Sequence, residues 1–453
     1  MLDVINPATG KVIRQLQWCD ESSLEQKLKN AALAYPAWRA LSFAERAEHL
    51  RRVAATLRES SQQHSALMTE EMGKPVLEAR GEVEKSASGC EHYADFAQQY
   101  LAPQDIPSDA KRSWVQFLPL GTVLGILPWN SPYWLATRVF APALMAGNTV
   151  ILKHDSHVPG CAAALEQAFA DAGVPKGVFQ TVMADHSDTE KMIRDPRISA
   201  VSFTGSTGAG SKVAAIAASA IKPAVLELGG SDPAIVLADA DLDKAVDVLT
   251  TSRFICAGQS CIAAKRLLIE ESIYAEFVEK FSTRLAQLKV GDPTEEDTDI
   301  GPIARADLRD ALHDQVTRSI AAGAKCLMGG KLPKGPGSFY PVTLLTDVPL
   351  DAAAFTEETF GPVAAVRAVE DVEEAFAIAN DTVYGLGASI WTQSERGAQL
   401  AARFESGQVA INGIVKSDPR LPSGGIKRSG YGKELGPHGI REFVNAQQVW
   451  QGE

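Results

Sequence analysis

Apolar residues recur at helical spacing between residues 42 and 101, with charged residues on the opposite face. This periodicity predicts amphipathic helices. Ser42 followed by Glu45 fits a capping box, so we expect one helix to begin there. The stripe that this helix is expected to bury consists of Leu50, Val53, Ala54 and Leu57.

After Pro103, short apolar runs alternate with helical segments. The runs GTVLGILPWN, NTVILKHD and RISAVSFTG are typical of buried strands. Between them, RVFAPALMAG and VPGCAAALEQAFADAG are typical of helices that end at glycine. This alternation indicates βαβ units and a parallel sheet, which binds ligands beyond the carboxyl ends of its strands. A second such series begins near residue 230, so the expected fold class is α/β.

Composition narrows the class of protein. The chain has 453 residues, of which 45% are hydrophobic, so disorder is excluded as a description of the whole chain. The length predicts about three domains. Lys and Arg number 44 against 56 Asp and Glu, a formal charge of −12. Because such a chain repels polyphosphate, we expect no nucleic-acid partner, although a local positive cluster could still bind a small anion.

The six cysteines are scattered, and neither a CxxC pair nor Cys/His spacing typical of a zinc site occurs in the sequence. We therefore expect no metal centre. The start of the chain, MLDVINPATGK, does not resemble a secretion signal, and the sequence contains no run of about 18 apolar residues that would span a membrane. A cytoplasmic protein with reduced thiols is expected.

Three side chains could take part in catalysis. Cys261, in AGQSC, follows a glycine-containing turn and could act as a thiolate nucleophile, although an isolated cysteine such as Cys256 is more often a small buried apolar residue. Glu227, in VLELGG, ends an apolar strand and could act as a general base or be a surface carboxylate. Asn130, in LPWNSP, could stabilise an oxyanion or simply occupy a turn.

The segment FTGSTGAG, residues 203–210, places glycines between a strand and a helix. Its spacing differs from G-x-G-x-x-G, so by itself it is only a weak indication of a phosphate site. Lys153, at another expected strand end, could anchor ribose or phosphate or could be a solvated lysine.

Together, these segments resemble the aldehyde dehydrogenase superfamily. The matching motifs, in order, are PWN (128–130), ILK (151–153), FTGST (203–207), LELGG (226–230), GQSC (258–261), EETFGP (357–362) and SGGIKRSGYGKE (423–434). The resemblance implies that Cys261 attacks an aldehyde carbon and forms a thioester. Asn130 and the Cys261 backbone N–H would hold the oxyanion. Glu227 would activate the water that releases a free carboxylic acid.

The resemblance also implies a nicotinamide cofactor, NAD or NADP. Lys153 would bind the adenosine ribose, and Ser156, where NAD-preferring relatives often carry glutamate, would tolerate a 2′-phosphate. The complete implied set is Trp129, Lys153, Ser156, Gly205, Ser206, Leu228, Glu358 and Phe360.

The substrate residues resemble those of short bacterial succinate-semialdehyde dehydrogenases. Arg138 would bind the far carboxylate of the substrate, and Ser417 would supply a hydroxyl beside it. A second arginine of that subgroup is replaced by Ile255, and the nearby Arg253 could substitute for it or point elsewhere. Glutarate semialdehyde and neutral aldehydes remain alternatives.

The resemblance implies three regions. A Rossmann-type cofactor domain would comprise residues 1–100 and 120–229, an α/β catalytic domain residues 230–421, and a small β extension residues 101–119 and 437–453. Because an extended arm is unstable alone, a homodimer or homotetramer is expected. Alternatives of another class are a cysteine esterase or hydrolase, which would need a histidine base, and a family member without catalytic activity.

Overall fold

A computed structural model describes residues 2–453. The first part of the chain is a hairpin followed by four helices, and the last three of these helices lie within residues 42–101, where the amphipathic pattern predicts helices. The Ser42–Glu45 capping box is present, with both of its reciprocal hydrogen bonds. The elements are β1 (Leu2–Ile5), β2 (Val12–Leu16), α1 (Glu21–Ala40), α2 (Phe43–Glu59), α3 (Ser61–Met72) and α4 (Val76–Tyr100).

A six-stranded sheet follows, in the order β17-β9-β8-β5-β6-β7. All pairs are parallel except the β17 pair with β9, so a segment near the end of the chain closes this sheet. The strands are β5 (Thr122–Ile126), β6 (Thr149–Lys153), β7 (Phe179–Thr181), β8 (Ile198–Thr204), β9 (Ala224–Glu227) and β17 (Gly430–Tyr431). The intervening helices are α5 (Trp134–Ala146), α6 (Pro159–Asp171), α7 (His186–Arg194) and α8 (Thr207–Ser219).

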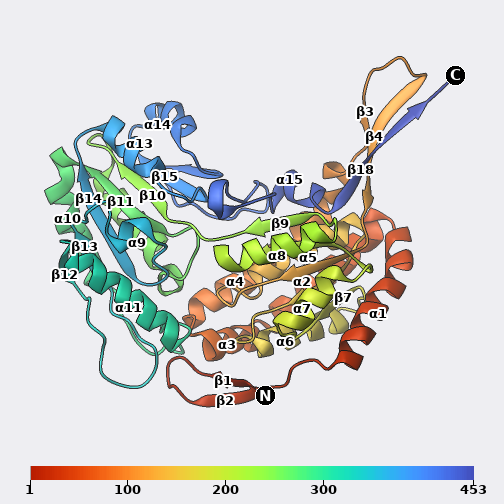
Figure 1. The fold of residues 1–453 in the computed structure, drawn as a ribbon, viewed down its shortest axis with the longest axis horizontal. Helices are drawn as coiled ribbons and strands as arrows, with labels where there is room; N and C mark the ends of the chain where they lie inside the picture. The colour runs from red at the N-terminus through yellow and green to blue at the C-terminus, as the bar shows by residue number, and fades with distance from the viewer. Residues whose placement is uncertain (1) are drawn as a thin grey trace.

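A seven-stranded sheet forms the other lobe, on the left in Figure 1, in the order β12-β13-β14-β11-β10-β15-β16. Its strands are β10 (Asp232–Val236), β11 (Ala264–Glu270), β12 (Lys325–Met328), β13 (Thr343–Thr346), β14 (Val363–Val369), β15 (Gly387–Trp391) and β16 (Gln408–Ile411). Its helices are α9 (Leu242–Phe254), α10 (Glu271–Leu285), α11 (Ala306–Ala321), α12 (Ala353–Thr356), α13 (Val372–Asn380) and α14 (Ser394–Leu400), with short 3-10 turns at Ile255–Gly258, Ala401–Arg403 and Lys427–Ser429.

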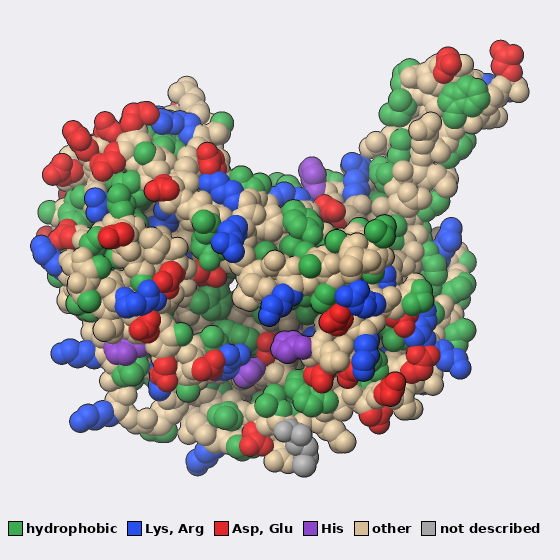
Figure 2. All heavy atoms as spheres, in the orientation of Figure 1, with side chains coloured by type: hydrophobic (Ala, Val, Ile, Leu, Met, Phe, Trp, Pro, Cys, Tyr) green, Lys and Arg blue, Asp and Glu red, His purple; other side chains and the backbone are tan. Residues whose placement is uncertain are grey.

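A third sheet projects from the body as an arm (Figure 1). It contains β3 (Gln104–Asp105), β4 (Arg112–Pro119) and β18 (Val444–Gln451), and β4 is its central strand. The short helix α15 (Gly436–Arg441) precedes β18 and packs on α4 and α5. Figure 2 shows hydrophobic side chains along this arm, where Ile106 is 50% exposed and Trp450 54% exposed.

The first two sheets agree with the α/β class predicted from the sequence, and their strands are mostly fully buried runs. Among residues 2–453, no helix has both the length and the apolar character needed to cross a lipid bilayer. The domain boundaries given above remain predictions.

Candidate active site

The six-stranded sheet reverses its strand order between β5 and β8. From β5 the chain proceeds to β6 and β7 on one side, whereas β8 and β9 lie on the other. Loops that leave such a switch point diverge and open a crevice at the carboxyl ends of the strands. The loop after β5 carries Trp129 and Asn130, and the loop after β8 carries Gly205 and Ser206.

Gly229 and Gly230 connect this sheet to the other one, because they join β9 to β10. A Cβ atom on Gly230 would lie 2.8 Å from the Cys261 carbonyl oxygen. This close approach brings Glu227, at the end of β9, towards Cys261, which lies three residues before the start of β11.

Asn130 also lies beside the cysteine loop. Its side-chain Nδ2 donates a hydrogen bond to the Gln259 carbonyl at 3.0 Å, two residues before Cys261. The structure therefore brings together Asn130, Glu227 and Cys261. Cys256, the other cysteine nearby, is buried, and its Sγ lies 3.6 Å from the Asn130 carbonyl oxygen.

The loop before Cys261 has an unusual backbone. Cys256 and Ala257 both have positive φ angles, 54° and 53°, which non-glycine residues rarely adopt. Gly258 follows with φ 73°, and a Cβ atom there would lie 2.2 Å from the Gly361 carbonyl oxygen. Such strain persists only where the surroundings fix the conformation, and it often accompanies function.

Two buried cations fix this loop. The Arg253 guanidinium donates to the carbonyls of Gly258 at 3.3 Å and Gly361 at 2.7 Å. Lys265 Nζ donates to the carbonyls of Ser260 at 2.9 Å and Cys261 at 2.7 Å. Because Arg253 is 0% exposed and its guanidinium binds backbone carbonyls, the contacts favour a structural role over replacement of the missing second arginine.

The Cys261 side chain is half-buried and lies among charges of both signs. Burial raises the pKa of its thiol to about 12, Lys265 and Arg138 lower it, and Glu358 and Glu227 raise it further. The thiol of the free protein is therefore protonated at neutral pH. Forming the thiolate requires a base or a ligand that changes these surroundings.

Glu227 is 4% exposed. Its Oε2 accepts a hydrogen bond from Arg138 Nη2 at 3.0 Å, whereas Oε1 has no hydrogen-bond partner within residues 2–453. Burial raises the pKa of Glu227 to about 7, Arg138 opposes that rise, and Glu434 adds to it. Such a carboxylate has one oxygen available and can exchange a proton near neutral pH.

The Arg138 guanidinium is buried between two glutamates. Nη2 contacts Glu227, and Nε pairs with Glu434. Nη2 also donates to Ser423 Oγ at 3.3 Å. The charge of Arg138 is thus already balanced by this chain. Its role in binding a substrate carboxylate remains a prediction, and the contacts favour a role in holding Glu227.

The residues implied for the cofactor surround the switch point. Ser206 caps α8 by accepting a hydrogen bond from the Ala209 N–H at 3.3 Å, and a Cβ atom on Gly208, in the first turn, would meet open space. Lys153 is half-buried at the end of β6, with its pKa lowered by burial. An open helix N-terminus, and a cation at the end of another strand of the same sheet, suit the phosphates and ribose of a dinucleotide.

Two aromatic rings and a carboxylate border the path from this crevice to Cys261. Trp129 and Phe360 meet edge to face with ring centroids 5.9 Å apart. Glu358 Oε1 accepts a hydrogen bond from the Gly230 N–H at 3.0 Å. Leu228 packs against α8, where a Cβ atom on Gly210 would lie 2.4 Å from its Cδ2. These residues fit a nicotinamide dinucleotide.

The Aldehyde dehydrogenase family pattern matches residues 1–449. The chain belongs to the aldehyde dehydrogenase family. It is 48% identical to a probable succinate-semialdehyde dehydrogenase, NADP(+), of Synechocystis sp., over 98% of each chain. It is 46% identical to a succinate semialdehyde dehydrogenase, NAD(P)+, of Escherichia coli, over 99% of this chain and 97% of that one.

The fold of this aldehyde dehydrogenase is also that of solved structures. A succinic semialdehyde dehydrogenase from Streptococcus pyogenes, in complex with NADP+ as the cofactor, has a TM-score of 0.97 at 34% identity, with 100% of both chains covered. This similarity confirms the resemblance and the fold predicted from the sequence.

Two residues that the sequence analysis missed lie in this region of the enzyme. Glu434 pairs with Arg138, and Lys85, on α4, donates from Nζ to Ser417 Oγ at 3.0 Å. Glu434 is the last residue of the SGGIKRSGYGKE motif, so the motif could have indicated that this residue lies at the site. Lys85 stands in an amphipathic helix, where a lysine is ordinarily a solvated residue.

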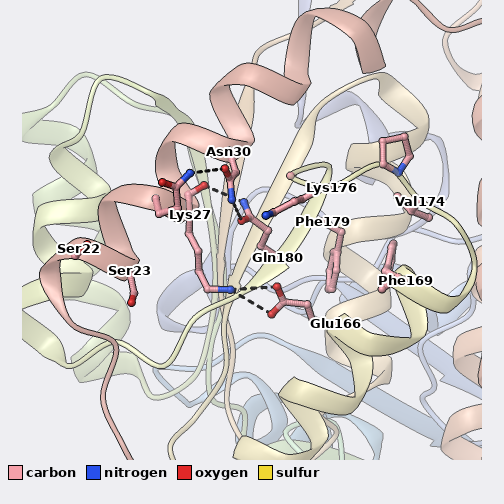
Figure 3. Close-up of a pocket in the computed structure, with 14 residues that line it drawn as sticks. Ser22, Ser23, Lys27, Asn30, Glu166, Phe169, Val174, Lys176, Phe179 and Gln180 are labelled. Carbon is pink, nitrogen blue, oxygen red and sulfur yellow. Dashed lines mark hydrogen bonds and ion pairs between the residues drawn. The ribbon is translucent and has the colours of Figure 1, made fainter.

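A hollow of about 700 Å³ lies elsewhere on this aldehyde dehydrogenase, between α1, α6 and β7 (Figure 3). Lys27 reaches across it to Glu166, with Nζ and Oε1 3.1 Å apart. The lining contains neither cysteine nor histidine, so the hollow has no nucleophile that could serve the family's reaction.

Proposed function

We propose that this aldehyde dehydrogenase oxidises succinate semialdehyde to succinate, with NADP or NAD as cofactor. The observation that carries the chemistry is the placement of Cys261 beside both Asn130 and Glu227, at the edge of a dinucleotide crevice. The two relatives at 48% and 46% identity, both named for this substrate, support the choice of aldehyde.

Cys261 is the nucleophile that attacks the aldehyde. The Cys261 thiol first releases its proton to solvent. The Sγ thiolate then attacks the carbonyl carbon, the S–C bond forms, and the carbonyl oxygen becomes an oxyanion. Asn130 Nδ2 uses one hydrogen to bind the Gln259 carbonyl, so its second hydrogen can bind that oxyanion together with the Cys261 backbone N–H. The adduct becomes a thioester when its oxyanion re-forms the carbonyl and its carbon loses hydride, which a nicotinamide dinucleotide held in the crevice would accept.

Glu227 completes the reaction. Its unpartnered Oε1 takes a proton from water, which attacks the thioester carbon and breaks the S–C bond. The carboxylic acid leaves and the Cys261 thiolate is regenerated. Arg138 holds the other oxygen of Glu227, so the carboxylate keeps a fixed orientation while it exchanges protons.

Lys153, Ser156, Gly205 and Ser206 would hold the dinucleotide, with Leu228, Glu358, Trp129 and Phe360 beside its nicotinamide end. Ser156 brings no charge to the region of the ribose. The neighbouring Asp155 is a carboxylate whose Oδ1 accepts hydrogen bonds from the His157 ring at 2.7 Å and from the His157 backbone N–H at 3.0 Å. The neutral Ser156 and the positive charge of Lys153 support the use of both cofactors.

The arm supports assembly into a homodimer or homotetramer. One edge of β18 is unpaired within residues 2–453, since β4 binds only its other edge. A free strand edge with exposed side chains such as Ile106 and Trp450 suits pairing with a second copy. The arm would then form the predicted oligomerisation extension, and the two larger sheets would belong to the cofactor and catalytic domains. Light scattering of the full chain tests the assembly, because it measures the mass of the oligomer.

Initial rates test the function. Succinate semialdehyde, glutarate semialdehyde and butanal are each supplied with NAD and with NADP, and reduced cofactor is followed at 340 nm. We expect the highest kcat/KM for succinate semialdehyde. A higher value for butanal would overturn the proposed substrate, and ester hydrolysis that needs no nicotinamide for turnover would favour a cysteine hydrolase instead.

A further inference from the structure

Lys85 is a half-buried lysine that lacks a carboxylate partner. Within residues 2–453, the only hydrogen bond that its Nζ donates goes to Ser417 Oγ, and no ion pair involves it. Its acidic neighbours are already occupied, because Glu82 pairs with Lys74 and Asp418 pairs with Arg420. A cation in this position retains both its charge and free donor hydrogens.

Ser417 is arranged to donate a hydrogen bond. Its Oγ accepts one from Lys85 Nζ at 3.0 Å and another from the Trp134 indole Nε1 at 2.7 Å. A hydroxyl has two acceptor lone pairs and one hydrogen, and both lone pairs are used. Within the described chain the Ser417 hydrogen binds no acceptor, although the residue is buried. It therefore suits an anion.

Trp134 fixes Lys85 above its ring. Nζ of Lys85 lies 4.3 Å from the ring centroid, in the range of a cation–π contact. Gly89, one helical turn further along α4, makes this approach possible, because a Cβ atom there would lie 3.0 Å from Trp134 Cζ3 and 2.9 Å from Thr137 Cγ2. The side chain is thus held by packing before any ligand arrives.

Arg138 connects this pair with the reacting cysteine. Its positive charge lowers the pKa of both Lys85 and Cys261, so both groups lie within its electrostatic reach. Arg138 itself is balanced by Glu227 and Glu434. Of these neighbouring cations, Lys85 is the one without a carboxylate partner, and a substrate carboxylate would supply it.

We propose that the Lys85 ammonium and the Ser417 hydroxyl form the subsite that binds the carboxylate of the aldehyde substrate, with Trp134 as its wall. The inference rests on the proposed function and assigns to Lys85 the choice of a carboxylated aldehyde over a neutral one.

Lys85→Met tests the subsite, because methionine keeps an unbranched stem over Trp134 and loses the charge. KM is measured for succinate semialdehyde and butanal with NADP. We expect KM for succinate semialdehyde to rise about 10- to 100-fold, the effect of losing a hydrogen bond to a charged group, while KM for butanal changes less than about twofold. Lys85→Arg should keep most of the preference, which separates loss of charge from damage to the fold.

Lys27→Met is the matched control, since Lys27 is also half-buried but pairs with Glu166 in the hollow of Figure 3. Its KM values should equal those of the wild type. Equal losses for both aldehydes in Lys85→Met, or an unchanged preference, overturn the role of Lys85 alone. A wild-type enzyme that does not prefer succinate semialdehyde overturns the proposed substrate as well.

Discussion

The two sides of the active site are held in different ways. On the nucleophile side, Arg253 and Lys265 donate hydrogen bonds to backbone carbonyls, which cannot change charge at any ordinary pH, and the Glu358 carboxylate lies further from Lys265, with Oε1 3.6 Å from Nζ. On the base side, Arg138 binds the carboxylates of Glu227 and Glu434, which can gain or lose a proton. The difference suggests that the backbone geometry of the cysteine loop must stay fixed, whereas the charge of the base must change during each turnover.

The largest expected effect comes from removing the nucleophile. Cys261→Ala should reduce kcat by about four to six orders of magnitude, because no covalent intermediate can form. Steady-state formation of reduced cofactor measures this loss. Cys256→Ala is the matched control, as its sulfur lies in the same loop, and near-normal turnover is expected there. Loss of activity in both variants would instead indicate damage to the loop.

Glu227→Gln should have the next largest effect, on the base side. We expect the steady-state rate to fall about 10²- to 10⁴-fold, the usual contribution of a general base. Stopped flow should still show a burst of reduced cofactor, because Glu227 acts on the thioester that the first half of the reaction forms, and because the Glu227 charge raises the pKa of the Cys261 thiol, so that losing this charge does not hinder thiolate formation. A steady-state rate equal to the wild type would exclude Glu227 as the base.

Asn130→Ala removes the side-chain amide that is expected to donate a hydrogen bond to the oxyanion, between the nucleophile side and the base side. Loss of one such donor costs about 10²- to 10³-fold in kcat. Here the burst itself should be slow, in contrast with Glu227→Gln, because the oxyanion forms in the first step. A burst of normal rate with slow steady state would place Asn130 in the second step instead.

Much of this site follows from the sequence. The positions of Asn130, Glu227 and Cys261 at strand ends or turns make them candidates, because the ends of parallel strands meet at one edge, whereas their roles follow from the motifs that resemble the aldehyde dehydrogenase superfamily. The left-handed backbone at Cys256 and Ala257 leaves no trace in residue type, since neither is glycine. The partner of Arg138 and the setting of Lys85 depend on contacts between distant segments, which periodicity does not encode.

Arg138→Lys should have the smallest effect and gives the sharpest comparison. A raised pKa keeps Glu227 protonated below pH 7, so the wild-type deacylation rate should rise through about pH 7 and level off above it. Arg138 lowers that pKa, and a lysine in its place cannot bind both glutamates as a guanidinium does. The midpoint should therefore move to higher pH, with kcat at neutral pH reduced several-fold, about 1 kcal/mol.

If Arg138 positions the base, the KM values for succinate semialdehyde and for butanal will change alike in Arg138→Lys. A rise for succinate semialdehyde alone, with an unmoved midpoint, would restore the carboxylate-binding role predicted from the sequence.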